Sequence, residues 1–188
     1  LWCGILLLSS SSAGLQATGI YTAAYQWHGP MVFVPIAISG VIMPLLTVEW
    51  EKSSYKTFRT AFLKIGLGVF TFTVLLILPI ILLGDYILSI YGGDFKSGWL
   101  VLFFVLCAAP FHGLSKLAFS ALLGMNRADT VLKMNVIWSV TYILIVMVTV
   151  EQYGAVGLAG ALLTSYILLA GFSSFQVVHL SLIKSHTN

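Results

Sequence analysis

Long uninterrupted runs of apolar residues constrain this chain more than any other feature of its sequence. A helix needs about 20 apolar residues to cross the hydrocarbon core of a bilayer. Five runs of that kind occupy residues 30–48, 65–83, 99–124, 131–150 and 156–178, and a shorter run occupies residues 1–13. We therefore expect an all-α protein, a polytopic bundle of about six transmembrane helices, the first of them partial.

The composition supports this prediction. Only 8% of the 188 residues are charged, 59% are hydrophobic, and the mean hydropathy is +1.01. Soluble domains carry about 25% charged residues, so this chain lacks the polar side chains to cover a water-facing surface. Cys3 and Cys107 both lie in apolar runs, which indicates small buried side chains rather than a disulfide or a metal site.

The first apolar run, residues 1–13, superficially resembles the core of a signal peptide, because small residues follow it. No basic residues precede it, and a signal peptide begins with a positively charged region. We therefore expect residues 1–13 to be a truncated helix, and residues 1–188 to be a fragment or C-terminal portion of a longer protein.

The connections between the runs alternate in charge. Lys and Arg gather on the cytoplasmic side of short loops. Residues 14–29 and 151–154 contain neither, and residues 84–98 contain only Lys96. The other connections are basic, which places Arg127 and the C-terminus in the cytoplasm and implies an even number of helices. The same rule predicts a cytoplasmic basic loop that contains Lys52, Lys56, Arg59 and Lys64. This loop sets the orientation and contacts phospholipid, or it captures an anionic headgroup.

A charged residue, Lys116, interrupts the run of residues 99–124. His112 and Ser120 lie four residues to either side of it, and therefore on the same face of a helix. A charge deep in a membrane costs about 2.5–3.5 kcal/mol on insertion scales and usually faces a cavity or a partner. No acidic residue lies within any of the apolar runs. The partner of Lys116 is then a residue outside this sequence or an anionic ligand; the alternative is a snorkelled lysine in a hydrated groove that binds nothing.

Weaker polar signals lie on the next predicted helix. Asn135 and Ser139 share a face with Tyr142, and either form hydrogen bonds between helices or line the same cavity as Lys116. Signals for catalysis are missing from the sequence: it has no paired intramembrane carboxylates, no Walker loop and no nucleophile beside a base. We expect no enzyme activity, no catalytic residue, no metal and no cofactor.

Four segments carry a resemblance to polysaccharide-export flippases. TGIYTAAYQWHGPMVFVPIAISGVIMPLL (residues 18–46) resembles their turn into a proline-containing helix before a basic loop. SIYGGDFKSGWLVLFFVLCAAP (89–110) looks like their external segment entering the next helix, and YGAVGLAGALLTS (153–165) resembles the external turn before their late helix. ALLGMNRADTVLKMNVI (121–137) looks like their cytoplasmic turn, with Asn126 in the usual place of a glycine. The motifs are loose, and their collinear order over nearly the whole chain carries the resemblance.

The resemblance implies a Wzx-type flippase for O-antigen or exopolysaccharide repeat units, in the multidrug/oligosaccharidyl-lipid/polysaccharide exporter superfamily. Such proteins have two six-helix lobes around a central cavity. They flip undecaprenyl-diphosphate-linked oligosaccharides across the bacterial inner membrane by alternating access. Residues 1–188 would form the C-terminal lobe, with the first helix truncated, the N-terminal lobe absent and the C-terminus cytoplasmic.

In that interpretation Lys116, assisted by His112, attracts the diphosphate, while Ser120, Asn135 and Ser139 line the cavity. The implied partners are the lipid-linked oligosaccharide, membrane lipids and a polysaccharide polymerase or chain-length partner, and no nucleic acid. The segment of residues 9–17 lacks the acidic residue expected near it, which leaves the coupling ion open.

Other functions remain open at this point. A drug or cation antiporter of the same superfamily would need an acidic residue in its cavity, and a lipid II flippase differs only in substrate. A membrane enzyme of lipid-linked sugar metabolism would need an acidic or His–Asp constellation at the membrane face. A purely structural bundle is disfavoured by Lys116 and by the prolines that interrupt the apolar runs.

Overall fold

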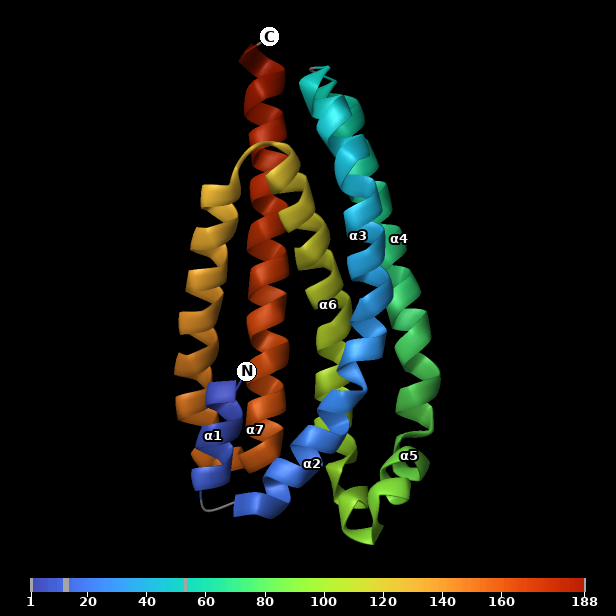
Figure 1. Ribbon diagram of the computed structural model, residues 1–188, viewed down its shortest axis with the longest axis vertical. Coiled ribbons are helices and arrows are strands. Elements are labelled where there is room, and N and C mark those ends of the chain that lie inside the picture. The colour runs from blue at the N-terminus through green and yellow to red at the C-terminus, as the bar shows by residue number, and fades with distance from the viewer. Residues whose placement is uncertain (1, 12–13, 53, 188) are drawn as a thin grey trace.

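The computed structural model describes residues 2–11, 14–52 and 54–187, and this part of the chain folds into helices without a strand (Figure 1). In chain order the elements are α1 (Trp2–Ser10), α2 (Gly14–Gln26), α3 (His28–Glu51), α4 (Tyr55–Leu82), α5 (Gly84–Tyr91), the 3-10 helix η1 (Gly93–Gly98), α6 (Trp99–Gly124) and α7 (Ala128–Thr187). The predicted all-α class is confirmed. Residues 1, 12 and 13 of the predicted first span lie outside the described residues.

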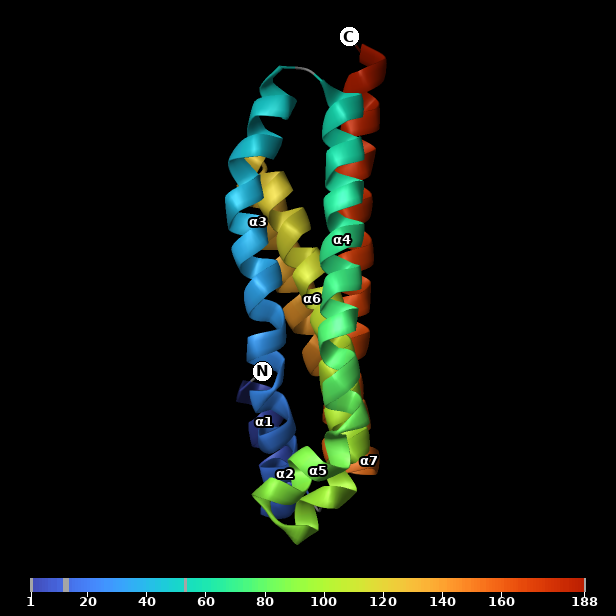
Figure 2. The same cartoon turned by 90° about the vertical axis from the view of Figure 1, so that its right-hand side faces the viewer.

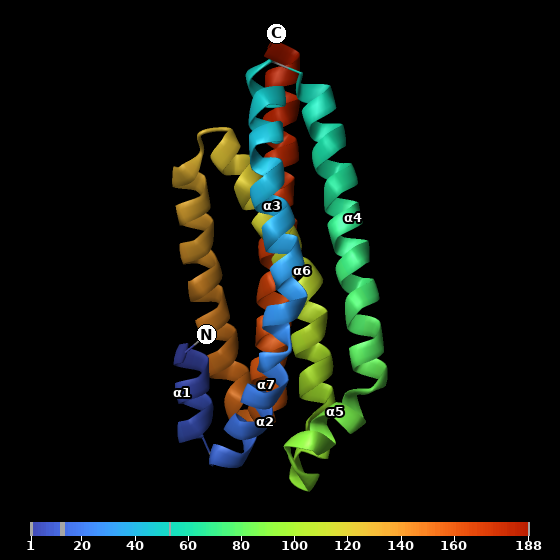
Figure 3. The same ribbon diagram turned by 45° about the vertical axis from the view of Figure 1, so that its right-hand side comes forward.

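The element α7 is a hairpin of two helices. Gly154 has φ 53° and ψ −129°, a conformation that breaks the helix and that glycine adopts readily because it lacks a Cβ. We call residues 128–153 the first arm and residues 155–187 the second arm; they run side by side in opposite directions (Figures 1 and 3). The Oγ1 of Thr149 donates a hydrogen bond to the carbonyl of Gly157 (3.1 Å) and ties the arms together near the turn. The predicted spans 131–150 and 156–178 occupy the two arms.

Four helical stretches are long and apolar enough to cross a membrane: Gly14–Glu51, Tyr55–Leu82, Phe95–Gly124 and Ala128–Ser185. The last of them contains both arms of α7. A helix rises 1.5 Å per residue, so each stretch exceeds the roughly 30 Å of a hydrocarbon core. The chain is a membrane protein, and its long helices stand alongside one another in one bundle (Figure 2).

Residues 14–29, predicted as a connection, are mostly helical. The helix α2 runs directly into α3, with a bend at Trp27, whose N–H donates to the carbonyl of Ala24 (3.2 Å). Pro30 has no N–H to donate to the carbonyl four residues earlier, which explains the break in the helix. The bend directs α2 across the end of the bundle, where Tyr21 is fully buried.

The predicted basic loop is shorter than expected. Only Lys52 lies in the connection between α3 and α4, while Lys56, Arg59 and Lys64 lie within α4. Helical structure extends beyond the apolar run here because the inward face of the first turns is aromatic: Phe58 and Phe62 are each 1% exposed. Residues 84–98, also predicted as a connection, form α5 and η1.

The two ends of the bundle differ in charge. The end that carries the C-terminus also holds the connection after α3 and the turn between α6 and α7 (Figure 1). Toward it lie Lys52, Lys56, Arg59, Lys64, Arg127, Lys133 and Lys184. At the opposite end, near Gly154 and η1, Lys96 is accompanied by Asp85 and Glu151. The helical connectivity thus places seven of the nine lysines and arginines toward one end of the bundle.

The helix α6 is the centre of the bundle and packs against α3, α4 and both arms of α7. It approaches α3 closely at Gly113. A Cβ built on Gly113 would lie 2.6 Å from the Cβ of Pro35 and 3.0 Å from its Cγ, so only glycine fits between these two backbones. This contact sets the separation of α3 and α6 at the level of the site described next.

Candidate functional site

Two histidines from distant parts of the chain form a hydrogen bond inside the bundle. Nε2 of His28, in the first turn of α3, lies 3.1 Å from Nδ1 of His112 on α6. Nδ1 of His28 lies 3.0 Å from the carbonyl oxygen of Val105, also on α6. His28 is only 1% exposed. The pair therefore crosslinks α3 and α6 by a polar contact in a mostly apolar core.

The histidine pair belongs to a row of rings that joins four elements. Tyr25 of α2 stacks on His28, with ring centroids 5.3 Å apart. Tyr166, on the second arm of α7, stacks on His112 at 4.3 Å, and Trp138 of the first arm lies 5.2 Å from Tyr166. Stacked rings of this kind stabilise by about 0.5–1.5 kcal/mol beyond their burial, and they hold the imidazole of His112 in a fixed orientation.

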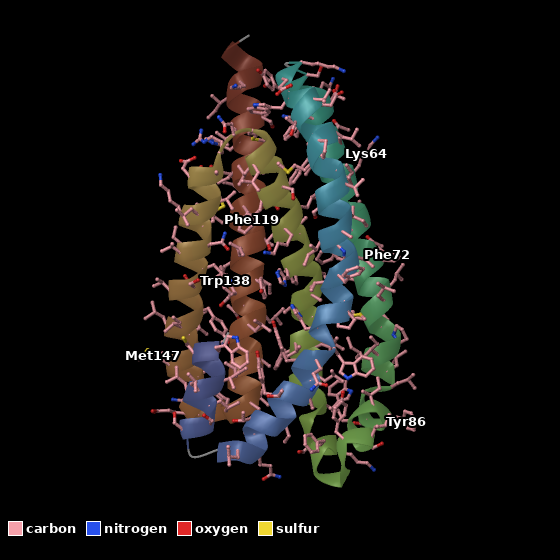
Figure 4. The ribbon with its side chains drawn as sticks, in the orientation of Figure 1. Lys64, Phe72, Tyr86, Phe119, Trp138 and Met147 are labelled. Atoms are coloured by element: carbon pink, nitrogen blue, oxygen red, sulfur yellow. The ribbon has the colours of Figure 1, made fainter. Side chains whose placement is uncertain are left out.

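A small cavity of about 60 Å³ lies beside His112, between α6 and the two arms of α7. It is lined by His112, Ser115, Lys116 and Phe119 of α6 and by Asn135, Trp138, Tyr166 and Leu169 of α7. Figure 4 shows Phe119 and Trp138 at the level of this junction. A cavity of this size has room for about one or two water molecules. In this conformation it is far too small for a sugar.

Lys116 is half-buried at this cavity and has no ion-pair partner among the residues that the structure describes. Its Nζ lies 6.0 Å from the centroid of the Phe119 ring. The carboxylate of Asp129 pairs instead with Arg127 and Lys133, at 3.6 Å each. The amine thus retains hydrogen-bond donors for water or for an anion.

The indole N–H of Trp138 adds a second donor without a partner near the cavity. Its Nε1 atom is buried and makes no hydrogen bond within the described part of the chain. A buried donor without a partner costs about 1–3 kcal/mol. A bound water or oxyanion that accepted from it would remove that cost.

The structure brings some of the predicted site residues together and separates others. Lys116, His112 and Asn135 line the same cavity. Ser120 and Ser139 are not among its lining residues. The hydrogen bonds expected between helices are local: Asn135 donates to the carbonyl of Val131, and Ser139 donates to that of Asn135, both at 2.9 Å. Side chains of Ser and Asn often bond to the preceding helical turn.

The basic residues of α4 form a separate surface. Lys56 and Lys64 flank Thr57, Thr60 and Ala61 along a shallow depression on the outer side of the helix. Lys52 and Arg59 do not line this depression. Figure 4 shows Lys64 at this upper part of α4.

His28 is not among the site residues that the sequence predicts. One signal could have identified it: Tyr21, Tyr25 and His28 follow one another at intervals of four and three residues, the spacing of one helical face. Among the described residues, no group of three or more His, Cys, Asp or Glu side chains could hold a metal ion.

These observations define a class of protein: a membrane-spanning helical bundle with a lysine and a histidine pair beside a polar cavity inside it. In comparisons with protein-family models, with curated proteins and with solved structures, nothing matches this chain.

Proposed function

We propose that this chain is the C-terminal lobe of a Wzx-type flippase, which moves undecaprenyl-diphosphate-linked oligosaccharides across the bacterial inner membrane by alternating access. The observation that carries the proposal is Lys116, a lysine within the span of α6 that lines a polar cavity and has no carboxylate partner among the described residues. The collinear resemblance of four segments to polysaccharide-export flippases supports the same function.

The chemistry of such transport requires little from the protein. A diphosphate must cross about 30 Å of hydrocarbon, so it needs a hydrated path and a positive charge along that path. Lys116 supplies the charge, and the unpaired indole N–H of Trp138 supplies a neutral donor. The cavity must widen to admit the headgroup. The prolines within α3 and α6, Pro35, Pro44 and Pro110, are points at which these helices can bend.

A cation antiporter is the main rival, and the position of the acidic residues argues against it. Such a transporter needs a carboxylate inside the membrane. The acidic residues of this chain lie at helix ends and connections: Glu49, Glu51, Asp85, Asp94, Asp129 and Glu151. The site therefore has the charge suited to an anionic cargo.

The basic end of the bundle faces the cytoplasm in this proposal, in accordance with the positive-inside rule. The lipid-linked oligosaccharide would then approach from the end that carries Lys56 and Lys64. Membrane lipids and a polysaccharide polymerase or chain-length partner complete the expected surroundings.

Transport by Lys116 variants tests the proposal. We expect Lys116→Ala in the intact protein to reduce flipping of lipid-linked oligosaccharide in proteoliposomes by about tenfold or more, the size of effect that losing a charged hydrogen bond of 1.5–3 kcal/mol produces. Lys116→Arg should retain much of the activity because the charge remains. Lys133→Ala is the matched control, since Lys133 is exposed and its one ion pair within the described residues is with Asp129. Normal flipping by well-expressed Lys116→Ala protein would contradict the assignment of the site.

A further inference from the structure

We propose that the histidine pair is a proton-binding site, and that the proton binds at Nε2 of His112 together with an anion at Lys116. This inference rests on the proposed function insofar as it uses Lys116 as an anion site. It adds a proton that binds together with the anion. It also assigns a role to His28, a residue that the anion site by itself does not require.

The direction of the hydrogen bonds follows from the acceptor at one end. The carbonyl oxygen of Val105 can only accept, so Nδ1 of His28 must carry the proton in their 3.0 Å contact. In a neutral imidazole the other nitrogen is then an acceptor. Nε2 of His28 therefore accepts, and Nδ1 of His112 donates in the 3.1 Å contact between the rings.

The same reasoning gives the protonation state of the fourth ring nitrogen of the histidine pair, Nε2 of His112. With its proton on Nδ1, neutral His112 has a lone pair on Nε2. This is the remaining ring nitrogen of the pair that can take up a proton, and it belongs to a side chain that lines the cavity. His28 acts as a positioning residue: by accepting from Nδ1 it selects the tautomer of His112 that keeps Nε2 free.

The surroundings of His112 determine when that proton can bind. On α6 itself the neighbouring charge is Lys116, one helical turn away. From α3 it meets His28, and from the second arm of α7 it meets the ring of Tyr166. Tyr25 of α2 lies behind His28.

The remaining neighbours are uncharged. The first arm contributes Asn135 and Trp138 to the cavity. On the side of α4, Phe70 packs against Phe111, the residue before His112. The described residues place no carboxylate at this cavity.

Proton and anion therefore assist each other at this site. An imidazolium beside the ammonium of Lys116 is repelled by it when the cavity holds only water, because like charges disfavour the charged form. An anion between the two cations offsets that repulsion. By linkage, anion binding favours protonation and protonation raises anion affinity by the same factor. In the step itself, one proton moves from water to the lone pair of Nε2, no other bond changes, and the proton leaves when the anion leaves.

Sulfate is the appropriate probe, since it stays doubly charged between about pH 5 and pH 9, while histidine ordinarily titrates near pH 6.5. Binding to the purified protein in detergent should be measured by titration calorimetry at about pH 8 and about pH 5.5, in buffers with different ionisation enthalpies. We expect sulfate to bind at least about fivefold more tightly at the lower pH, within the usual range of coupling. The buffer dependence should show uptake of a proton with each sulfate.

Variants assign the effect to the pair. His112→Gln should make the sulfate affinity equal at the two pH values, because it removes the ring nitrogen that takes up the proton. His179→Gln is the matched control; His179 is exposed on the second arm and stacks only on Phe175 among the rings described, so its loss should leave the coupling intact. His28→Phe should weaken the coupling, since Nδ1 of His112 then loses its acceptor.

The outcomes separate this inference from the proposed function. Sulfate binding that depends on Lys116 but is equal at both pH values would overturn the proton site and leave the anion site standing. Coupling that persists in His112→Gln would do the same. Sulfate binding that is unaffected by Lys116→Ala, or absent at both pH values, would overturn the anion site and with it this inference. If His112→Gln fails to fold, the proton uptake by the unaltered protein decides the question.

Discussion

Asn126 ends α6 in a conformation that few residues other than glycine adopt. Its φ is 59°, and it is the one non-glycine residue with a positive φ in the part of the chain that the structure describes. The N–H of Asn126 donates to the carbonyl of Leu123, and that of Arg127 donates to Leu122, both at 2.9 Å. This pair of bonds is a Schellman motif, which satisfies carbonyls at the end of a helix. Asparagine tolerates the left-handed conformation better than other residues with a Cβ.

Substitution of Asn126 should therefore affect stability in a predictable order. Asn126→Ala should lower the free energy of unfolding by about 1 kcal/mol, because alanine is strained at this φ. Asn126→Gly should leave it unchanged or raise it slightly. Unfolding in mixed detergent, followed by loss of helical circular dichroism, measures the difference. Equal stability of the alanine and glycine variants would contradict the left-handed assignment.

At the scale of the helices, the contact between α3 and α6 depends on Gly113. The ring of Pro35 is held close to its own backbone, so it cannot move away from an added methyl group as a flexible side chain would. His112 precedes Gly113, which means that the same contact brings His112 within reach of His28. Packing and the hydrogen bond of the pair are thus parts of one arrangement.

Gly113→Ala should destabilise the protein by about 1–3 kcal/mol, the usual cost of overpacking a core. It should also weaken the pH coupling of anion binding, because α3 and α6 would separate at His28. Gly160→Ala is the control, since no heavy atom lies within 4 Å of a Cβ built there. The control should be neutral or up to about 1 kcal/mol more stable, because alanine favours a helix. A Gly113→Ala protein as stable as this control would show that the close contact with Pro35 is wrong.

The helices differ in how far the sequence predicts them. The lengths of apolar runs predict the long helices, because a membrane span needs continuous apolar surface whatever its partners are. The helix α2 (Gly14–Gln26) does not follow from that rule, since threonine, glutamine and tyrosine interrupt its apolar residues. It is stabilised by packing, with Tyr21, Ala23 and Ala24 buried, and such contacts are visible only in the folded chain.

The candidate site is also predictable from the sequence only in part. His112 and Lys116 share a helix face by local spacing, which the sequence reveals directly. Asn135 joins them through the tight turn between α6 and α7. His28 lies 84 residues from His112, and its contact depends on the bend at Trp27 and on the approach at Gly113. Neither the bend at Trp27 nor the close approach at Gly113 produces a periodic pattern in the sequence.

At the scale of the whole molecule, the bundle separates charge between its two ends. The end with the C-terminus collects the lysines and arginines of α4, of α7 and of the connections that follow α3 and α6, whereas Gly154 and η1 lie at the other end (Figure 1). Because loops rich in Lys and Arg remain in the cytoplasm, the connection after α3 and the turn at Gly154 should face opposite compartments.

Cysteine labelling in intact cells tests this orientation. In a background with Cys3 and Cys107 replaced by alanine, Lys52→Cys should be protected from an impermeant thiol reagent until the membrane is opened. Gln152→Cys, exposed beside the turn of α7, should react without opening the membrane. The reverse pattern would invert the proposed topology, and reaction at both positions would mean that the two ends do not lie on opposite sides.

The account as a whole depends on Lys116 facing a wet passage, and one measurement tests this most directly. In the same cysteine-free background, Lys116→Cys should react with a cationic, membrane-impermeant methanethiosulfonate reagent, because the charged reagent can reach it only through water. Phe72→Cys is the reference, since Phe72 is 44% exposed on the outer side of α4 (Figure 4) and should face lipid. The account predicts labelling at position 116 and none at position 72. Equal protection of both positions, in membranes where the protein with Lys116 intact transports, would show that position 116 lies in lipid or sealed protein and would contradict the account.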